Sequence, residues 1–162
     1  MNFSHPFTPF VDANSTVLIL GTFPSIKSFE ENFYYGHPKN QFWKLISSVF
    51  DEVEPKTIDD KKSFLKKHGI ALWDVVKSCD RKNSLDSNLK NIVPNDIKSV
   101  LQEFPNIKKL YFTSKTALKV YEKYFKDLKL PYFYLDSPSP AYAKKSFAQK
   151  LKSWKMISTN IT

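Results

Sequence analysis

The residues best suited to chemistry lie in one stretch, GTFPSIKSFEENFYYGHPKNQFW, which spans residues 21–43. Its second half contains two adjacent tyrosines, Tyr34 and Tyr35, followed by His37 and Asn40. Aromatic rings stack on nucleic-acid bases, and a carboxamide or an imidazole holds a polar group or a water molecule. The combination suits a nucleotide held out of its stack. Each residue also has a structural interpretation: Asn40 as the N-cap of a following helix, the tyrosines as core walls and His37 as a hydrogen-bonding group.

A second polar stretch, DSPSPAYA, covers residues 136–143. Its hydroxyls and backbone amides are groups that hold phosphates, and the lysines that follow it favour approach to a phosphate backbone. The residues of interest are Ser137, Pro138, Ser139, Pro140, Ala141, Tyr142, Lys144 and Lys145. The same stretch is also typical of a turn that enters a helix, with Ser137 or Ser139 as the N-cap.

Four short apolar runs alternate with helical patterns, and these elements must position both stretches. The predicted strands are residues 16–20, 70–76, 107–113 and 132–135, and helices are expected to begin near residues 42, 57, 95, 114 and 144. Strands that alternate with helices predict a parallel sheet with helices on both faces. Both polar stretches follow strands, so they should meet at the carboxyl edge of the sheet, where open α/β folds bind ligands.

The rest of the chain supports more local expectations. Residues 1–15 are expected to form an irregular arm, and the polar segment 79–96 is expected to be a long loop. Thr57, Asn95 and Ser114 are the expected helix N-caps. One helix is expected to bury Leu118, Tyr121, Tyr124 and Phe125, and the last helix to keep Lys144, Lys145, Lys150, Lys152 and Lys155 away from its apolar face.

The composition limits the class of protein. The chain has 162 residues, with 25 lysines and arginines against 16 acidic residues and a formal net charge of +9. We expect a single domain over residues 1–162, with a basic surface that suits a polyanion such as nucleic acid. The single cysteine, Cys79, excludes an internal disulfide and a multi-thiolate metal site, and the three histidines show no ligand spacing, so no metal is expected. Without a long apolar run or a signal peptide, we expect a cytoplasmic protein, and a monomer by default.

Four motifs occur in an order and spacing that resemble the uracil-DNA glycosylase superfamily, and most of all its hypoxanthine-DNA (deoxyinosine) glycosylase branch. They are VLILGTFPSIKSF, YYGHPKNQFW, GIALWDVVKSCDRKNSLDSNLKN and SPSPAYAKKSFAQKLKSW, and the resemblance covers residues 16–157. It implies a three-layer α/β/α sandwich with a four-stranded, mainly parallel sheet. It also implies DNA containing deaminated bases as the partner, and no cofactor.

The resemblance also implies roles for residues of the first stretch. Phe23 stands where other branches carry a catalytic aspartate or asparagine, and the hypoxanthine branch uses the asparagine of its HPxN segment instead, which is Asn40 here. Tyr35 lies where mismatch-specific relatives place an aromatic ring that stacks on the flipped base. His37 is a second candidate catalytic residue, as a polar contact to the base or to water. The base would rest against Gly21, Thr22, Phe23 and Ser25.

The second stretch occupies the place of the superfamily loop that presses on the minor groove and fills the gap left by the extruded nucleotide. Ser137 stands where the best-known uracil enzymes have a histidine, so no imidazole is available there. Ala141 lies at the wedge position, and Tyr142 beside it is a better candidate to fill the gap. The DNA backbone contacts would come from Ser137, Pro138, Ser139, Pro140, Lys144 and Lys145.

We therefore expect a monofunctional DNA glycosylase of base excision repair that hydrolyses the N-glycosidic bond of a flipped deaminated base, with hypoxanthine as the favoured one. The alternative within this class is a uracil glycosylase that acts on mismatched or single-stranded DNA. A non-catalytic nucleic-acid binding module is a second alternative, because Phe23 occupies the usual catalytic position. A small-molecule α/β enzyme is a third, disfavoured by the charge and by the lack of a phosphate-binding glycine loop.

Overall fold

The computed structural model describes residues 2–5, 7–24, 28, 30, 33–80 and 89–159. Its central element is a four-stranded sheet in the order β3-β2-β6-β7. The strands are β2 (Val17–Gly21), β3 (Ile70–Asp74), β6 (Lys109–Phe112) and β7 (Tyr132–Tyr134). All three pairings between neighbours are parallel, so the prediction of a four-stranded, mainly parallel sheet is confirmed.

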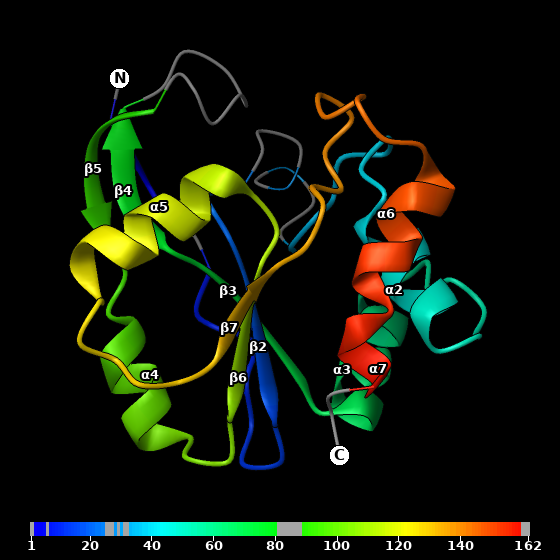
Figure 1. Ribbon diagram of the computed structural model, residues 1–162, viewed down its shortest axis with the longest axis horizontal. Coiled ribbons are helices and arrows are strands. Elements are labelled where there is room, and N and C mark those ends of the chain that lie inside the picture. The colour runs from blue at the N-terminus through cyan, green and yellow to red at the C-terminus, as the bar shows by residue number, and fades with distance from the viewer. Residues whose placement is uncertain are drawn as a thin grey trace.

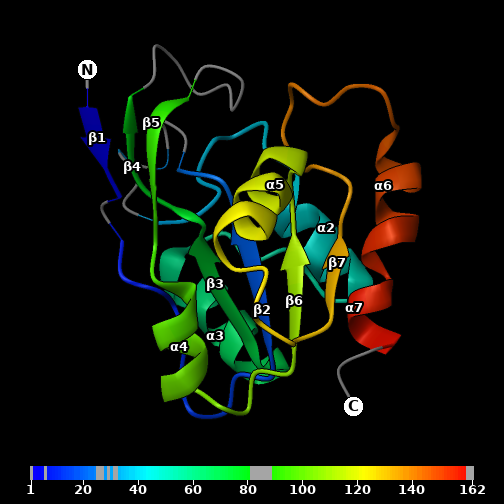
Figure 2. The same ribbon diagram turned by 60° about the vertical axis from the view of Figure 1, so that its left-hand side comes forward.

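Helices cover both faces of this sheet and give the three-layer arrangement predicted from the sequence (Figures 1 and 2). One face carries α2 (Phe42–Val49), α3 (Ile58–His68), α6 (Phe147–Trp154) and α7 (Met156–Thr159), and the other carries α4 (Ile97–Glu103) and α5 (Lys115–Tyr124). All five residues of β2 are buried, as expected for a central strand covered on both faces. No helix within the described ranges is long and apolar enough to cross a membrane.

Side-chain caps fix where several helices begin. Thr57 and Ser114 accept the backbone N–H groups of Asp60 and Ala117, so both predicted N-caps are confirmed. The cap of the last helix is Ser146, which forms a capping box with Gln149, and not Ser137 or Ser139 as the sequence suggested. The proline-rich stretch is therefore a separate loop that ends several residues before the helix.

A small second sheet was not expected from the sequence. It has the order β1-β4-β5 and contains β1 (Asn2–Ser4), β4 (Val76–Asp80) and β5 (Lys90–Pro94), all antiparallel. The expectations of an irregular arm over residues 1–15 and of a loop over residues 79–96 are wrong where these strands lie. Register shifts between β4 and β5 break the regular alternation that identifies a strand in a sequence. Residues 81–88 lie outside the described ranges.

Three further expectations are corrected by side-chain contacts. Asp96, not Asn95, caps α4 by accepting the Ser99 N–H, while Asn95 is buried and donates to the carbonyl of Asp74 at the end of β3. Tyr124 is 43% exposed, because it lies at the last position of α5. Lys150 is only 3% exposed, because its ammonium group turns inward to the side chain of Gln41 instead of facing solvent.

Candidate active site

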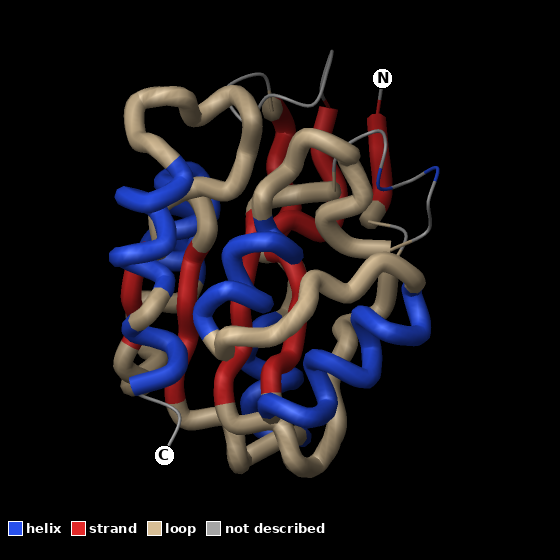
Figure 3. Tube along the Cα trace, turned by 90° about the vertical axis from the view of Figure 1, so that its right-hand side faces the viewer, coloured by secondary structure: helices blue, strands red, loops and turns tan. Residues whose placement is uncertain are grey.

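A cavity of about 190 Å³ lies at the carboxyl ends of the parallel strands, between the loop after β2 and the loop after β7. Figure 3 shows loops gathered at this end of the strands. The cavity is lined by Gly21, Thr22, Phe23, Ser28, Tyr35, His37, Asn40, Asp74, Thr113, Ser114, Ser137, Pro138, Ser139, Pro140 and Ala141. The two polar stretches singled out in the sequence therefore meet around one space. Ser25 lies outside the described residues.

Two hydrogen bonds at Gln41 connect the start of α2 with the proline-rich loop and with α6. The backbone N–H of Gln41 donates to the Pro138 carbonyl at 2.9 Å, and the ammonium group of Lys150 donates to the Gln41 side-chain oxygen at 2.8 Å. Burial lowers the pKa of Lys150, against the opposing effect of Asp136. The start of α2, the proline-rich loop and α6 are thus held together, which keeps Asn40 beside Pro138.

Asn40 has both a structural and a cavity-lining position. Its Oδ1 accepts the Phe42 N–H at 2.9 Å, and because that N–H can only donate, the orientation of the carboxamide is determined. Within the described residues, the Nδ2 amide makes no hydrogen bond. Asn40 therefore supports the beginning of α2 and still offers two N–H donors and a second lone pair on its oxygen.

Tyr35 is held in an unusual backbone conformation, with φ at 53°. Such left-handed conformations are uncommon outside glycine and are concentrated at functional sites. Its ring stacks on Phe42 with the centroids 4.0 Å apart and the planes 2° from parallel. Its hydroxyl lies 3.2 Å from Thr113 Oγ1. One face of the ring is thus covered, and a ligand can stack only on the opposite face.

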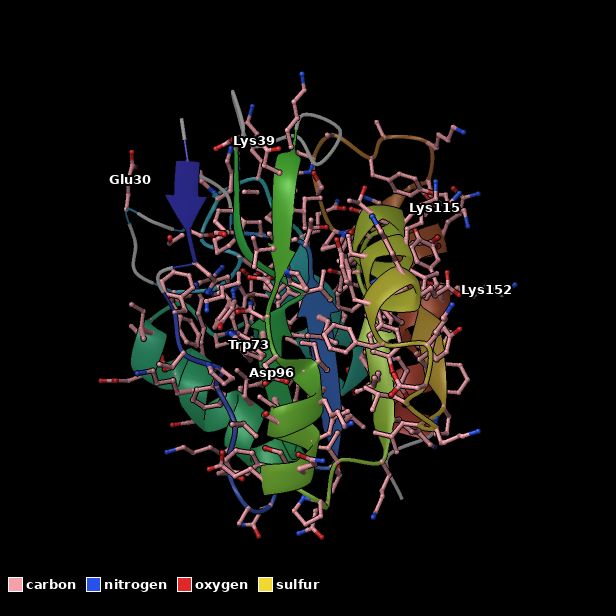
Figure 4. The ribbon with its side chains drawn as sticks, turned by 90° about the vertical axis from the view of Figure 1, so that its left-hand side faces the viewer. Glu30, Lys39, Trp73, Asp96, Lys115 and Lys152 are labelled. Carbon is pink, nitrogen blue, oxygen red and sulfur yellow. The ribbon has the colours of Figure 1, made fainter. Side chains whose placement is uncertain are left out.

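His37 also lines the cavity, but one of its ring nitrogens is already engaged. Its Nδ1 accepts the Lys39 N–H at 3.1 Å, so the neutral ring has its proton on Nε2. Lys39 is exposed, and Figure 4 shows it at the loop end of the molecule. This part of the loop therefore offers a ring N–H donor and a cation close to the cavity.

Four residues that line the cavity were not identified from the sequence. They are Ser28, Asp74, Thr113 and Ser114. Ser28 and Ser114 hold neighbouring groups, because Ser28 accepts the Gly36 N–H at 2.8 Å and the Ser114 hydroxyl lies 2.6 Å from that of Thr22. Asp74 lies within the predicted strand over residues 70–76, so its type and position are visible in the sequence. This position could have identified Asp74 as a site residue, because ligands of parallel sheets bind at the carboxyl ends of the strands.

Asp74 is the charged group of the cavity wall and has a partner from the N-terminal arm. The His5 Nε2 lies 2.7 Å from Asp74 Oδ2, and the side chains are 2% and 6% exposed. Burial raises the pKa of the neighbouring Tyr34 phenol, and Asp74 raises it further. Tyr34 therefore keeps its proton, which it donates to the Thr8 carbonyl at 3.0 Å.

Three predicted DNA-contacting residues lie beyond the cavity lining. Tyr142 is half-buried, with the Lys150 ammonium 5.5 Å from its ring centroid. Lys145 donates to both carboxylate oxygens of the buried Asp136, at 3.1 and 3.2 Å. Lys144 is exposed. Lys145 is therefore paired with Asp136, although its own side chain is 45% exposed, whereas Lys144 is exposed and outside this pair.

Comparison with known proteins gives consistent results. Residues 8–158 match the family model of the uracil DNA glycosylase superfamily. A Methanosarcina barkeri protein named hypoxanthine DNA glycosylase is 34% identical over 112 residues, which cover 68% of this chain and 71% of that protein. A Methanosarcina acetivorans protein of the same name is 33% identical over 112 residues, with the same coverage.

A solved structure supports the same relationship. The solution NMR structure of a proposed uracil DNA glycosylase from Methanosarcina acetivorans superposes with a TM-score of 0.80. Its sequence is 28% identical, and the match covers 98% of this chain and 99% of the other. The similarity thus extends over nearly the whole of both chains.

Proposed function

The chain belongs to the uracil DNA glycosylase superfamily and is a DNA glycosylase, and we propose that the base it removes is hypoxanthine. The two relatives named hypoxanthine DNA glycosylase support this choice. The observation that carries the proposal is the convergence of Asn40, Tyr35 and the proline-rich loop on one cavity. At about 190 Å³ the cavity is smaller than the roughly 300–1,000 Å³ of drug-sized ligand pockets, which suits a single extruded base.

Base recognition begins with extrusion of the nucleotide. Flipping costs a few kcal/mol, and least for a mispaired base, so a deaminated base enters more easily than a correctly paired one. The face of Tyr35 opposite Phe42 would stack on the base, while Phe42 supports the ring from behind. The backbone of Gly21, Thr22 and Phe23 would bound the base on the sheet side. Because the Tyr35 ring already stacks on Phe42, this surface exists before the base arrives.

Asn40 would position the water that attacks the sugar. A neutral carboxamide is a poor general base, so its contribution is orientation: Nδ2 donates to the water and the second lone pair of Oδ1 accepts from it. The bond to Phe42 N–H holds the group rigidly for this role. The Nε2–H of His37 would donate to the departing base, which gains negative charge as the bond breaks.

The proline-rich loop would hold the DNA backbone on the other side of the cavity. Ser137 and Ser139 would contact phosphate oxygens, and Pro138 and Pro140 would keep the loop in one conformation. The exposed Ala141 would face the gap in the duplex, with Tyr142 next to it as the larger filler. Of the two predicted lysines, Lys144 would be the phosphate contact, because Lys145 is paired with Asp136.

Uracil is the second candidate base, because the superposed Methanosarcina acetivorans structure is that of a proposed uracil DNA glycosylase. A single-turnover assay distinguishes the two on duplexes that carry one deoxyinosine or one deoxyuridine, with alkaline scission of the abasic product. We expect cleavage at deoxyinosine. Cleavage at deoxyuridine alone would contradict the proposed base, and release of neither base would contradict the proposed activity.

Substitutions at position 40 test the proposed catalytic role. Asn40→Ala should reduce the single-turnover rate at least about 10²-fold, because water is no longer positioned. The same change removes the acceptor for Phe42 N–H and should cost about 1 kcal/mol of folding stability. Asn40→Ser keeps an acceptor for that N–H and should restore stability without restoring the rate.

Thr57→Ala is the matched control for the position-40 variants. It removes the N-cap of α3, outside the cavity lining, so it should lower stability by a similar amount and leave the rate unchanged. An Asn40→Ser variant as active as wild type would show that Asn40 serves only α2.

A further inference from the structure

Lys150 of α6 is the one buried lysine in the described part of the chain, and it lies outside the cavity lining. Its ammonium group donates to Gln41 Oε1 at 2.8 Å and lies 5.5 Å from the centroid of the Tyr142 ring. The charge of Asp136 acts on Lys150, but Asp136 forms its ion pair with Lys145. A buried ammonium group with a neutral amide as its acceptor is costly, so stability alone does not account for a lysine here.

Gln41 connects this ammonium group to both sides of the cavity. It directly follows Asn40 and is the N-cap residue of α2, but its side chain makes no capping hydrogen bond. The carboxamide is therefore not needed to begin the helix, and its oxygen accepts from Lys150 instead. The backbone N–H of Gln41 donates to the Pro138 carbonyl at 2.9 Å. One residue thus joins α6, the segment that carries Asn40 and the proline-rich loop.

Phe42 extends this arrangement to the surface on which the base would stack. It follows Gln41, its ring stacks on Tyr35 with the centroids 4.0 Å apart, and the Trp154 ring of α6 meets it edge-on at 5.5 Å. The helices α2 and α6 lie side by side on one face of the sheet (Figure 1). A shift of Gln41 relative to α6 would therefore move both Asn40 and the support of Tyr35. A misplacement of about 1 Å can slow a reaction about 10²-fold.

We propose that Lys150 is a positioning residue for base release: its bond to Gln41 keeps Asn40 and the proline-rich loop in the geometry that the reaction needs. The proposal rests on the proposed function and assigns part of the rate to a residue outside the cavity lining. Because Lys150 is buried, it does not add to the attraction between the protein surface and phosphates. Its loss should therefore slow the reaction of bound DNA without weakening the binding of undamaged DNA.

Lys150→Met tests this role, because methionine keeps most of the buried aliphatic length and removes the donor. We expect the single-turnover rate at deoxyinosine, measured with enzyme in saturating excess, to fall about tenfold, as for one hydrogen bond to a charged group. The affinity for an undamaged duplex and its dependence on salt should match those of wild type. A parallel fall in affinity with a shallower salt slope would place Lys150 in the DNA interface and contradict the inference.

Variants of Gln41 test the same bond from its other end, whether or not Lys150→Met folds. Gln41→Met removes the acceptor and keeps the backbone N–H that donates to Pro138, so it should lower the rate by a similar factor. Gln41→Glu keeps an oxygen acceptor for the ammonium group and should retain the wild-type rate. The double variant Gln41→Met/Lys150→Met should be no slower than the slower single variant, because both changes remove one bond. Additive losses would contradict action through Gln41.

Ser146→Ala is the matched control for a loss of stability in α6. It removes the capping box with Gln149 and leaves the bond between Lys150 and Gln41 in place, so it should lower the free energy of unfolding and leave the rate unchanged. If Lys150→Met and Gln41→Met release hypoxanthine at the wild-type rate, or if Ser146→Ala slows release as much as they do, this inference is wrong and the proposed function stands. A wild-type protein that releases no base contradicts both.

Discussion

Gly21 brings three parts of the cavity into contact at one Cα atom. A Cβ atom there would lie 2.6 Å from Asp74 Oδ1 and 3.0 Å from the Tyr35 hydroxyl, so the absence of a side chain allows both groups to approach. Gly69 is needed for a different reason, because its φ of 66° ends α3 in the left-handed conformation. Gly21 is thus needed for the close packing of the cavity wall, and Gly69 for the backbone conformation that ends α3.

Alanine substitution should separate these two roles. Gly21→Ala displaces Asp74 and Tyr35 and should reduce the single-turnover rate about 10²-fold, because catalytic geometry tolerates shifts of well under 1 Å. Gly69→Ala should leave that rate unchanged and lower the free energy of unfolding by about 1–2 kcal/mol in urea titrations. Full activity of Gly21→Ala would mean that the close approach of Asp74 and Tyr35 to Gly21 is unimportant for the reaction.

Residues of the site differed in how far the sequence could identify them. Tyr35, His37 and Asn40 stand together in one loop, so their types and proximity are visible in the sequence. Asp74 stands in an otherwise apolar strand as a lone carboxylate, for which a loop or capping role is the default interpretation. The contact between His5 and Asp74 joins residues far apart in the sequence, and only the folded arm brings them together.

At the level of elements, Asn95 secures the transition between the two sheets. The chain leaves β3 at Asp74 and enters β4 at Val76, and the Asn95 side chain donates to the carbonyls of both residues, at 2.8 and 3.1 Å. Its backbone N–H donates to the Val75 carbonyl at 2.8 Å. Asn95 is buried, so these carbonyls have no access to water as a replacement donor.

Removal of this side chain should be costly. Asn95→Ala leaves two buried carbonyls with fewer donors and should lower the free energy of unfolding by about 1–3 kcal/mol. Asn106→Ala is the comparison, because that exposed side chain donates once, to the Ala13 carbonyl, and its removal should cost less than about 1 kcal/mol. Equal destabilisation by the two substitutions in urea titrations would contradict this account of the junction.

Elements with strong local signals were predictable, and those that depend on distant partners were not. The helix after Thr57 has a cap, an apolar face and a terminal glycine within its own sequence. In contrast, β1 is three residues long and exists through its pairing with β4, and the β4–β5 register is irregular. Asn95 was assigned as a cap for the same reason: its three carbonyl partners belong to a sharp turn that the sequence does not reveal.

At the level of the whole molecule, exposed cations lie beside the cavity. Lys39, Lys115 and Lys144 are all exposed, and each stands within three residues of a cavity-lining residue. Figure 4 shows Lys115 at the start of α5 and Lys152 directed outward from α6. Acidic side chains gather elsewhere, around a separate shallow pocket that includes Glu52, Glu54 and Asp60. The charge is thus distributed so that a polyanion is attracted toward the cavity.

Salt dependence should reveal which of these cations bind DNA. The affinity for duplex DNA should fall linearly on a log–log plot against salt concentration, and Lys144→Gln should make that slope shallower by about 0.9 if Lys144 neutralises one phosphate. Lys66→Gln is the control, because Lys66 is exposed in the last turn of α3, which leads to the amino end of β3. Equal slopes for Lys144→Gln and wild type would remove Lys144 from the interface.

The small sheet also gives the molecule a built-in chemical reporter. Cys79 is the one cysteine among the 162 residues, it is buried, and it lies in β4 opposite Phe3 of β1. A thiol-modifying reagent therefore reaches it only when the small sheet opens. Since β1 leads directly into His5, the rate of labelling at Cys79 reports opening of the sheet that carries the arm, with no engineered probe.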